Sequence, residues 1–248
     1  MEYIIRTVKK YHIAYGLMPY KRNQDVIRVH DLDEAHYVLA IADGWNRPDA
    51  FPGDEPGREV AKIVASEYPK IFLSLSITNL HKRALAASQT LDDRIAKKYP
   101  RLATAVATFI FHTNKEECIV SVGDVETYLW DGTHWYKPKE ISDHALDFKT
   151  YESNVARFFG AREHKQDPRF PGIFNAEADV RKVSITMPIL IATDGIKDVL
   201  SLSDINALAV NPEKESPKKI VETILGEVAR RGGQRDDISV LVRGLDKP

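Results

Sequence analysis

Two apolar runs that each end in Asp-Gly place the strongest constraint on this chain. The first is Val38–Gly44 and the second, much later in the sequence, is Ile189–Gly195. Such runs are typical of buried strands, and a buried strand holds a carboxylate at its tip rigidly. Asp-Gly alone is also a common turn dipeptide, because glycine adopts positive φ and Asp bonds nearby backbone groups. We expect the two copies to lie close in space, and their function to depend on the residues that join them.

Composition excludes several classes of protein. The chain has 248 residues, 43% of them hydrophobic, which predicts one domain over residues 1–248. Its 35 basic and 36 acidic residues nearly cancel, which argues against nucleic acid and membrane surfaces as partners. No signal-like start and no apolar run near the roughly 20 residues of a membrane span is present, so we expect a cytoplasmic protein. The single cysteine, Cys118, rules out an intrachain disulfide framework and a cysteine zinc cluster.

The pattern of the remaining sequence predicts an α+β protein in which helices cover antiparallel sheets. Helices are predicted from Gly57, with an interruption at Pro69, from the N-cap Asn79, and after Ser216-Pro217 up to Gly232. Short turns separate four strands between 103 and 136, which predicts an antiparallel meander. For residues 140–180, the sequence predicts loop and short helix.

Carboxylates recur where predicted strands begin or stop. They are Asp25, Asp43, Asp124, Asp194 and Asp236. No basic residue adjoins Asp43 or Asp194 in the sequence, so converging carboxylates would repel one another unless a cation lay between them. Oxygen ligands alone suit Mg²⁺ or Mn²⁺. The histidines show no paired metal-ligand spacing, and we interpret His30 and its counterparts in other strands as structural.

Eight short motifs occur in one order along the chain. They are Asn23-Gln-Asp25, Ile41-Ala-Asp43-Gly44, Gly57-Arg-Glu-Val-Ala61, Ala103-Thr-Ala-Val106, Val122-Gly-Asp124, Ser142-Asp-His144, Ala192-Thr-Asp194-Gly195 and Arg235-Asp236-Asp237-Ile-Ser239. This order resembles the metal-dependent protein serine/threonine phosphatases of the PPM, or type 2C, family, over nearly the whole chain. The resemblance implies a four-layer sandwich of two antiparallel β-sheets flanked by α-helices.

The resemblance also implies a site with two Mn²⁺ or Mg²⁺ ions, at which a metal-bound hydroxide hydrolyses phosphoserine or phosphothreonine in a phosphoprotein substrate. The implied catalytic and metal residues are Asp43 as the bridging ligand, Asp194 and Asp236 on one ion, the Gly44 carbonyl on the other, Asp25 holding metal-bound water, and Asp124 with Asp194 at a third ion. Lys21 and Arg22 both lie near the position of the family's phosphate-binding arginine, and Lys21 is the favoured phosphate-binding residue.

This chain departs from the family pattern at four places. Trp45 stands where some members carry a histidine proposed as general acid, Gln24 replaces an acidic residue, Asp237 replaces an asparagine, and the 45–56 loop is longer. The first two and the loop motivate a rival hypothesis, a catalytically weak or inactive domain that binds phosphorylated partners. A different two-metal hydrolase, such as a nuclease, is the second rival, and the near-neutral charge argues against it.

Overall fold

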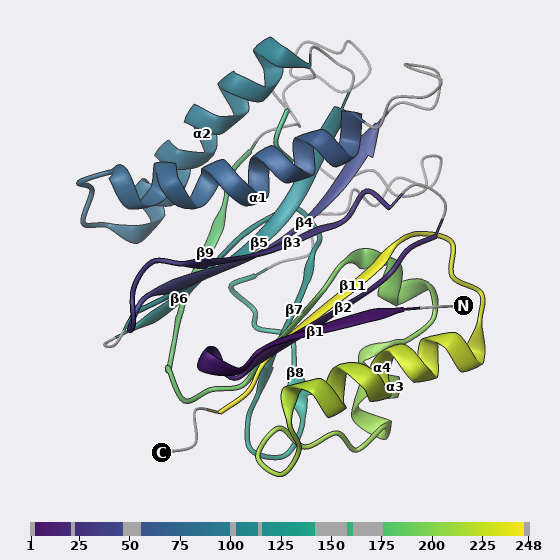
Figure 1. Ribbon diagram of the computed structural model, residues 1–248. Helices are drawn as coiled ribbons and strands as arrows, with labels where there is room; N and C mark the ends of the chain where they lie inside the picture. Colours follow the sequence, from purple (N-terminus) through teal and green to yellow (C-terminus); the bar gives the residue numbers. More distant parts are fainter. Residues whose placement is uncertain are drawn as a thin grey trace.

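The computed structural model describes residues 3–20, 23–46, 56–99, 103–113, 116–141, 158–160 and 176–245. Two antiparallel sheets lie face to face, and helices cover their outer faces (Figure 1). We call the sheets the β11 sheet and the β4 sheet. The β11 sheet has the order β1 (Ile4–Val8), β2 (Ile13–Met18), β11 (Ile238–Arg243), β10 (Ile189–Ala192), β7 (Glu126–Trp130) and β8 (Trp135–Tyr136). The β4 sheet has the order β3 (Val26–Asp31), β4 (Tyr37–Asn46), β5 (Ala103–His112), β6 (Glu117–Val122) and β9 (Asp179–Val183).

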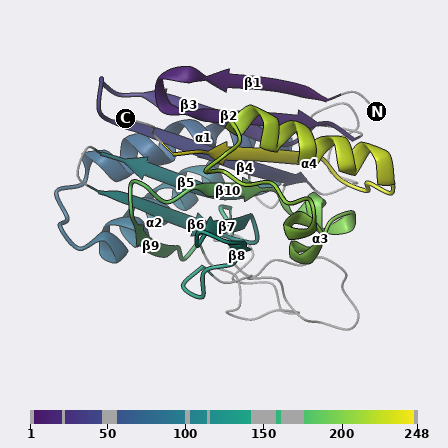
Figure 2. The same ribbon diagram turned by 90° about the horizontal axis from the view of Figure 1, so that it is seen from below.

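Each sheet carries its own helices. Helices α1 (Pro56–Ser74) and α2 (Leu80–Lys98) cover the β4 sheet, whereas α3 (Leu202–Ala207) and α4 (Pro217–Arg231) cover the β11 sheet (Figure 2). Short 3₁₀ helices, η1 (Lys9–Tyr11) and η3 (Asp194–Asp198), follow β1 and β10. The predicted α+β sandwich, two antiparallel sheets flanked by helices, is confirmed.

Strand alternation decides which residues face the space between the sheets. On β4, Val38, Ala40 and Ala42 pack against the helices, whereas Leu39 and Ile41 pack in the core between the sheets. Successive side chains of a strand point to opposite faces, so the inward series continues to the next odd-numbered residue. The fold therefore directs the carboxylate at the tip of β4 toward the other sheet.

The predicted meander over 103–136 is wrong in one respect. Strands β5 and β6 pair in the β4 sheet, but β7 pairs with β10 and β8 in the β11 sheet. The chain crosses between sheets at Gly123-Asp124, where Gly123 has a φ of 101°. Glycine adopts such a φ without strain, and the sharp turn sends the chain away from β6.

Helix α1 continues through Pro69, where the sequence predicted an interruption. Proline has no N–H, so the carbonyl four residues earlier, that of Ala65, loses its helical donor. The imidazole of His30 on β3 lies 2.7 Å from this carbonyl oxygen and pairs with it through Nε2. His30 is therefore a structural residue, as expected. Its imidazole replaces the backbone donor that Pro69 lacks, so the helix can continue through the proline.

The predicted helix ends are confirmed. Asn79 accepts a hydrogen bond from the backbone N–H of Lys82 at 3.0 Å, and Ser216 caps α4 ahead of Pro217. Gly232 follows α4 with a φ of 67°. Capping groups satisfy backbone donors that the helix itself leaves unpaired.

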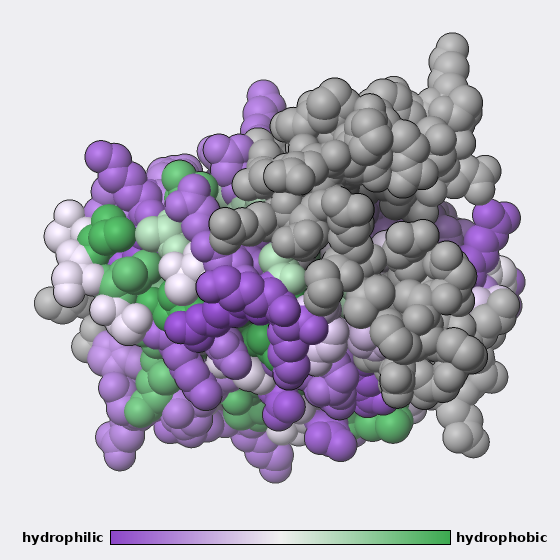
Figure 3. Space-filling view, turned by 90° about the horizontal axis from the view of Figure 1, so that it is seen from above, coloured by the Kyte–Doolittle hydropathy of each residue, from purple (hydrophilic) through white to green (hydrophobic). Residues whose placement is uncertain are grey.

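The outer face over α1 and α2 mixes apolar and polar side chains (Figure 3). Leu73 and Leu85 are exposed there, and scattered exposed leucines are normal for a globular protein. Among the described helices, none has the length and apolar character that crossing a bilayer requires.

Candidate metal centre

The two Asp-Gly tips meet between the sheets. Asp43 ends the inward series of β4, and Asp194 follows β10 as the first residue of η3. The carboxyl groups of Asp43 and Asp194 share a side-chain hydrogen bond. The prediction that the two copies lie close in space is confirmed.

Three further predicted residues join this pair. The β3–β4 register places Val26 opposite Ala42, so Asp25 lies beside Asp43. Burial raises the pKa of Asp43 well above its usual range, and the carboxylates of Asp25, Asp194, Asp236 and Asp124 raise it further. The structure therefore brings all five predicted aspartates into one acid cluster.

Asp25, Asp194 and Asp236 in the acid cluster also hold protons more tightly than free carboxyls. Burial, and then the carboxylate of Asp237, raises the pKa of Asp25 to about 8. Burial raises the pKa of Asp194, although its hydrogen bond with Asp43 opposes this. Asp236 is the most exposed of these residues, and partial burial of its carboxyl raises its pKa to about 6. Negative charge is thus unfavourable throughout the acid cluster when no cation is present.

Both glycines of the Asp-Gly pairs are required for close packing of the backbone. A Cβ on Gly44 would lie 2.2 Å from the carbonyl oxygen of Gly57 at the start of α1. A Cβ on Gly195 would lie 2.3 Å from the carbonyl oxygen of Asp237. Neither Gly44 nor Gly195 has a positive φ, so the turn explanation fails for both. Close approach of two chain segments is the physical reason for glycine here.

The donor set fits a hard divalent cation. It consists only of carboxylate oxygens and backbone carbonyls, and the carboxylates repel one another. The Oδ1 atom of Asp25 is buried and has no hydrogen-bond partner in the described part of the chain. In their present positions, the described His, Cys, Asp and Glu side chains form no group of three or more close enough to hold a metal ion. Metal binding therefore requires small movements of carboxylates that now share protons.

A lysine beside Asp194 corrects the expectation that this carboxylate lacks a nearby cation. Lys197 lowers the pKa of Asp194 and pairs with the buried Glu126 at 2.7 Å. Lys137 also pairs with Glu126, at 2.9 Å. The spacing of Asp194 and Lys197 was the signal for this contact in the sequence, because residues three apart lie on the same side of a 3₁₀ helix.

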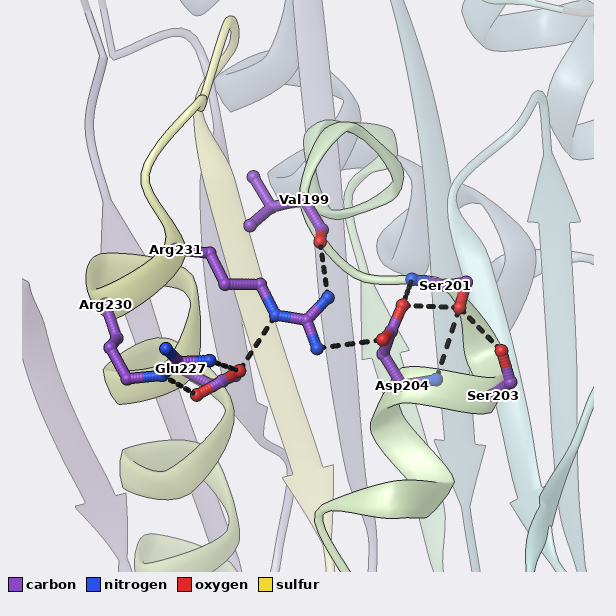
Figure 4. Close-up of polar contacts among 7 residues, drawn as sticks. All are labelled: Val199, Ser201, Ser203, Asp204, Glu227, Arg230 and Arg231. Carbon is purple, nitrogen blue, oxygen red and sulfur yellow. Dashed lines mark hydrogen bonds and ion pairs between the residues drawn. The ribbon is translucent and has the colours of Figure 1, made fainter.

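Arg231 makes a set of hydrogen bonds near the end of η3, which we call the arginine clasp (Figure 4). Arg231, the last residue of α4, donates to the carbonyl of Val199 at 3.3 Å and to Asp204 of α3 at 2.8 Å. It also donates to Glu227 within α4 at 2.8 Å. Arg230 contacts Glu227 as well, in the same helix. The clasp therefore ties α3 and α4 to the segment that starts at Asp194.

Asp237 has a role that the sequence did not reveal. Its carboxylate accepts hydrogen bonds from the backbone N–H groups of Tyr20 at 2.6 Å and Gln24 at 2.5 Å. Thr193 donates to the other buried carboxylate, that of Asp25, at 2.8 Å. A carboxylate at 237 accepts both backbone donors at once, which an amide with one oxygen does less well.

Several predicted positions fall outside the described residues. They are Lys21, the Ser142-Asp-His144 motif, most of the loop after Trp45, and most of residues 140–180. Trp45 itself is 52% exposed at the end of β4, and Gln24 lies beside Gly57.

Comparison with known proteins gives matches in structure alone. No protein-family profile matches the sequence, and neither does any curated protein. The catalytic domain of the serine/threonine phosphatase PstP, solved with two manganese ions, matches with a TM-score of 0.66 at 15% identity, covering 99% of this chain and 100% of that one. The PPM phosphatase MsPP from Mycobacterium smegmatis, in complex with cacodylate, gives 0.66 at 17% identity, covering 94% and 97%. Stp1 from Staphylococcus aureus gives 0.67 at 13% identity, covering 99% and 94%. From its two sheets, its flanking helices and these matches over nearly full length, the chain has the fold of the bacterial PPM serine/threonine phosphatases.

Proposed function

We propose that this protein is a PPM-type protein serine/threonine phosphatase that depends on Mn²⁺ or Mg²⁺. The observation that carries the proposal is the convergence of Asp43 and Asp194 from opposite sheets, with Asp25, Asp124 and Asp236 around them. Among proteins with this fold, PstP has been solved with two manganese ions. The acid cluster of this chain lies on the same fold, and its carboxylates repel one another when no cation lies between them.

In this proposal, the acid cluster holds two ions and Asp124 contributes to a third. Asp43, Asp194 and Asp236 are the principal ligands, with the Gly44 carbonyl and Asp25 in support. Bound divalent ions supply a nucleophile at neutral pH and neutralise the charge of the phosphoryl group.

The residues around the acid cluster position it and tune its charge. Thr193 orients the carboxyl of Asp25 by donating to Oδ2. Lys197, held by Glu126, favours the ionised form of Asp194, which is the form that binds cations. Lys21 is proposed to bind the phosphate of a phosphoprotein substrate.

Hydrolysis of p-nitrophenyl phosphate and of a phosphothreonine peptide tests the proposal. Assays contain Mn²⁺, Mg²⁺ or EDTA and compare the wild type with Asp194→Asn and with Asp131→Asn, a control in an exposed loop. We expect metal-dependent turnover in the wild type and the control, and a loss of at least about 100-fold in Asp194→Asn, as for removal of one key electrostatic group. Wild-type protein that binds Mn²⁺ by calorimetry yet shows no turnover would refute the phosphatase. That result would favour the inactive binding domain, with the exposed Trp45 as the first residue to restore to histidine.

A further inference from the structure

Strands β1 and β3 of the two sheets lie side by side at the edge of the sandwich (Figure 2). Residues of both strands line a groove there, which we call the basic groove. Its volume is about 250 Å³, and β1, β2, β3, β11 and the start of α1 line it. Four lining side chains are cationic: Arg6, Arg28, Arg58 and Lys62. Asp25, buried, is the acidic residue among the described lining.

Two of these cations have no partner among the described residues. Arg6 and Arg28 are exposed, and neither makes a hydrogen bond or ion pair with any described residue. Other arginines of the described surface are paired, as Arg94 is with Glu67 and Arg231 with Asp204. In a chain of net charge −1, four cations around one cavity are a local concentration of positive charge rather than a general property.

The rest of the lining indicates what kind of anion fits. Ile4, Leu17 and Val26 provide apolar walls, which a small inorganic ion would leave uncovered. The hydroxyl of Ser239 lines the groove and is buried beside the carboxyl of Asp25. The guanidinium groups match the paired oxygens of a phosphoryl group.

We propose that this basic groove binds a phosphoryl group carried on a peptide, as an anion subsite that adjoins the acid cluster at Asp25. The identification of the peptide as part of a phosphoprotein substrate rests on the proposed function. The binding itself depends on Arg6, Arg28, Arg58 and Lys62 and on no metal. A second phosphorylated residue of the substrate would then dock at the edge of the sandwich.

Calorimetry in EDTA tests the proposal directly. The titrants are a phosphoserine peptide, its unphosphorylated counterpart and inorganic phosphate. The proteins are the wild type, the double variant Arg6→Gln/Arg28→Gln, and Lys97→Gln/Lys98→Gln on α2, which removes the same charge from another exposed surface. We expect phosphopeptide affinity to fall at least about tenfold in the groove variant and less than about twofold in the control. Thermal melts confirm that both variants are folded.

The outcomes separate this proposal from the proposed function. Equal phosphopeptide affinity in the wild type and the groove variant overturns the groove, whatever the enzymatic activity. Selective loss of binding in the groove variant supports the groove even if the wild type proves unable to hydrolyse p-nitrophenyl phosphate with Mn²⁺. Inorganic phosphate that binds as tightly as the phosphopeptide, and loses affinity in the same variant, identifies the free anion as the ligand source.

Discussion

Replacing Asp25 by asparagine should stabilise the metal-free protein at pH 7 and lose that advantage at pH 5. Burial and the neighbouring Asp237 raise the pKa of Asp25 from 3.8 to about 8. A carboxyl with a raised pKa takes up a proton on folding, so its cost to stability is absent below pH 3.8 and grows with pH until about pH 8. Each pH unit adds about 1.4 kcal/mol, which gives about 4 kcal/mol at pH 7 and about 2 kcal/mol at pH 5.

The asparagine removes this cost but introduces another. Its NH₂ group would replace the Oδ1 atom of Asp25, which is buried without a partner. A buried unpaired donor costs about 1–3 kcal/mol, and this cost does not depend on pH. We therefore expect a net gain of about 1–3 kcal/mol at pH 7 and no gain at pH 5. The difference between the two pH values, about 3 kcal/mol, is independent of the amide cost.

Urea unfolding in EDTA at pH 5 and pH 7 measures this difference. Asp131→Asn is the matched control, because hydrogen bonds from the backbone N–H groups of His134 and Thr133 lower the pKa of Asp131 to about 2. Both pH values lie above its folded and unfolded pKa, so its own ionisation contributes the same at each, and any difference comes from its pairing with His134 at 3.2 Å. An Asp25→Asn effect that also stays the same, within about 0.5 kcal/mol, would refute the account of charge in the acid cluster.

Two further predictions concern the support of the site. Gly195→Ala should destabilise the protein by at least about 2 kcal/mol, because the added Cβ meets a backbone carbonyl that cannot move aside. Gly226→Ala on α4 should stabilise it by about 0.5–1 kcal/mol, because the nearest atom to the added Cβ is 3.9 Å away. Urea unfolding that ranks the two variants the other way contradicts the packing argument. Arg231→Ala should lower the melting temperature more than Arg230→Ala, because Arg231 contacts Val199, Asp204 and Glu227 whereas Arg230 makes a surface pair within α4. Thermal melts of the pair test this, and equal shifts would show that the clasp adds nothing.

Much of the fold could be predicted because the signals were local. Asn79 and Ser216 marked helix starts, and the apolar runs before Asp43 and Asp194 marked buried strands. These signals depend on neighbours within a few residues, which sequence reveals directly. The four-layer architecture was implied by the resemblance of the ordered motifs to the PPM phosphatases.

What could not be predicted depends on contacts between distant segments. The chain crosses between the sheets at Gly123 because β7 pairs with β10. The residue pattern of a strand does not show which other strand it pairs with. His30 can pair with the carbonyl that Pro69 leaves without a donor because β3 lies against α1. The role of Asp237 depends on backbone donors near the other end of the chain, more than 200 residues away in sequence. The roles assigned to the aspartates as metal ligands and to Lys21 stay predictions.

The position of β11 between β2 and β10 has a consequence for how the protein matures during synthesis. Strands β3 to β6 pair with sequence neighbours, so the β4 sheet can begin to form while the chain is still being translated. The β11 sheet cannot close until β11 has left the ribosome, because β2 and β10 each pair with it. Asp236 and Asp237 immediately precede β11. A nascent chain that still lacks β11 therefore has no complete acid cluster, and the metal binding proposed above has to wait for that strand.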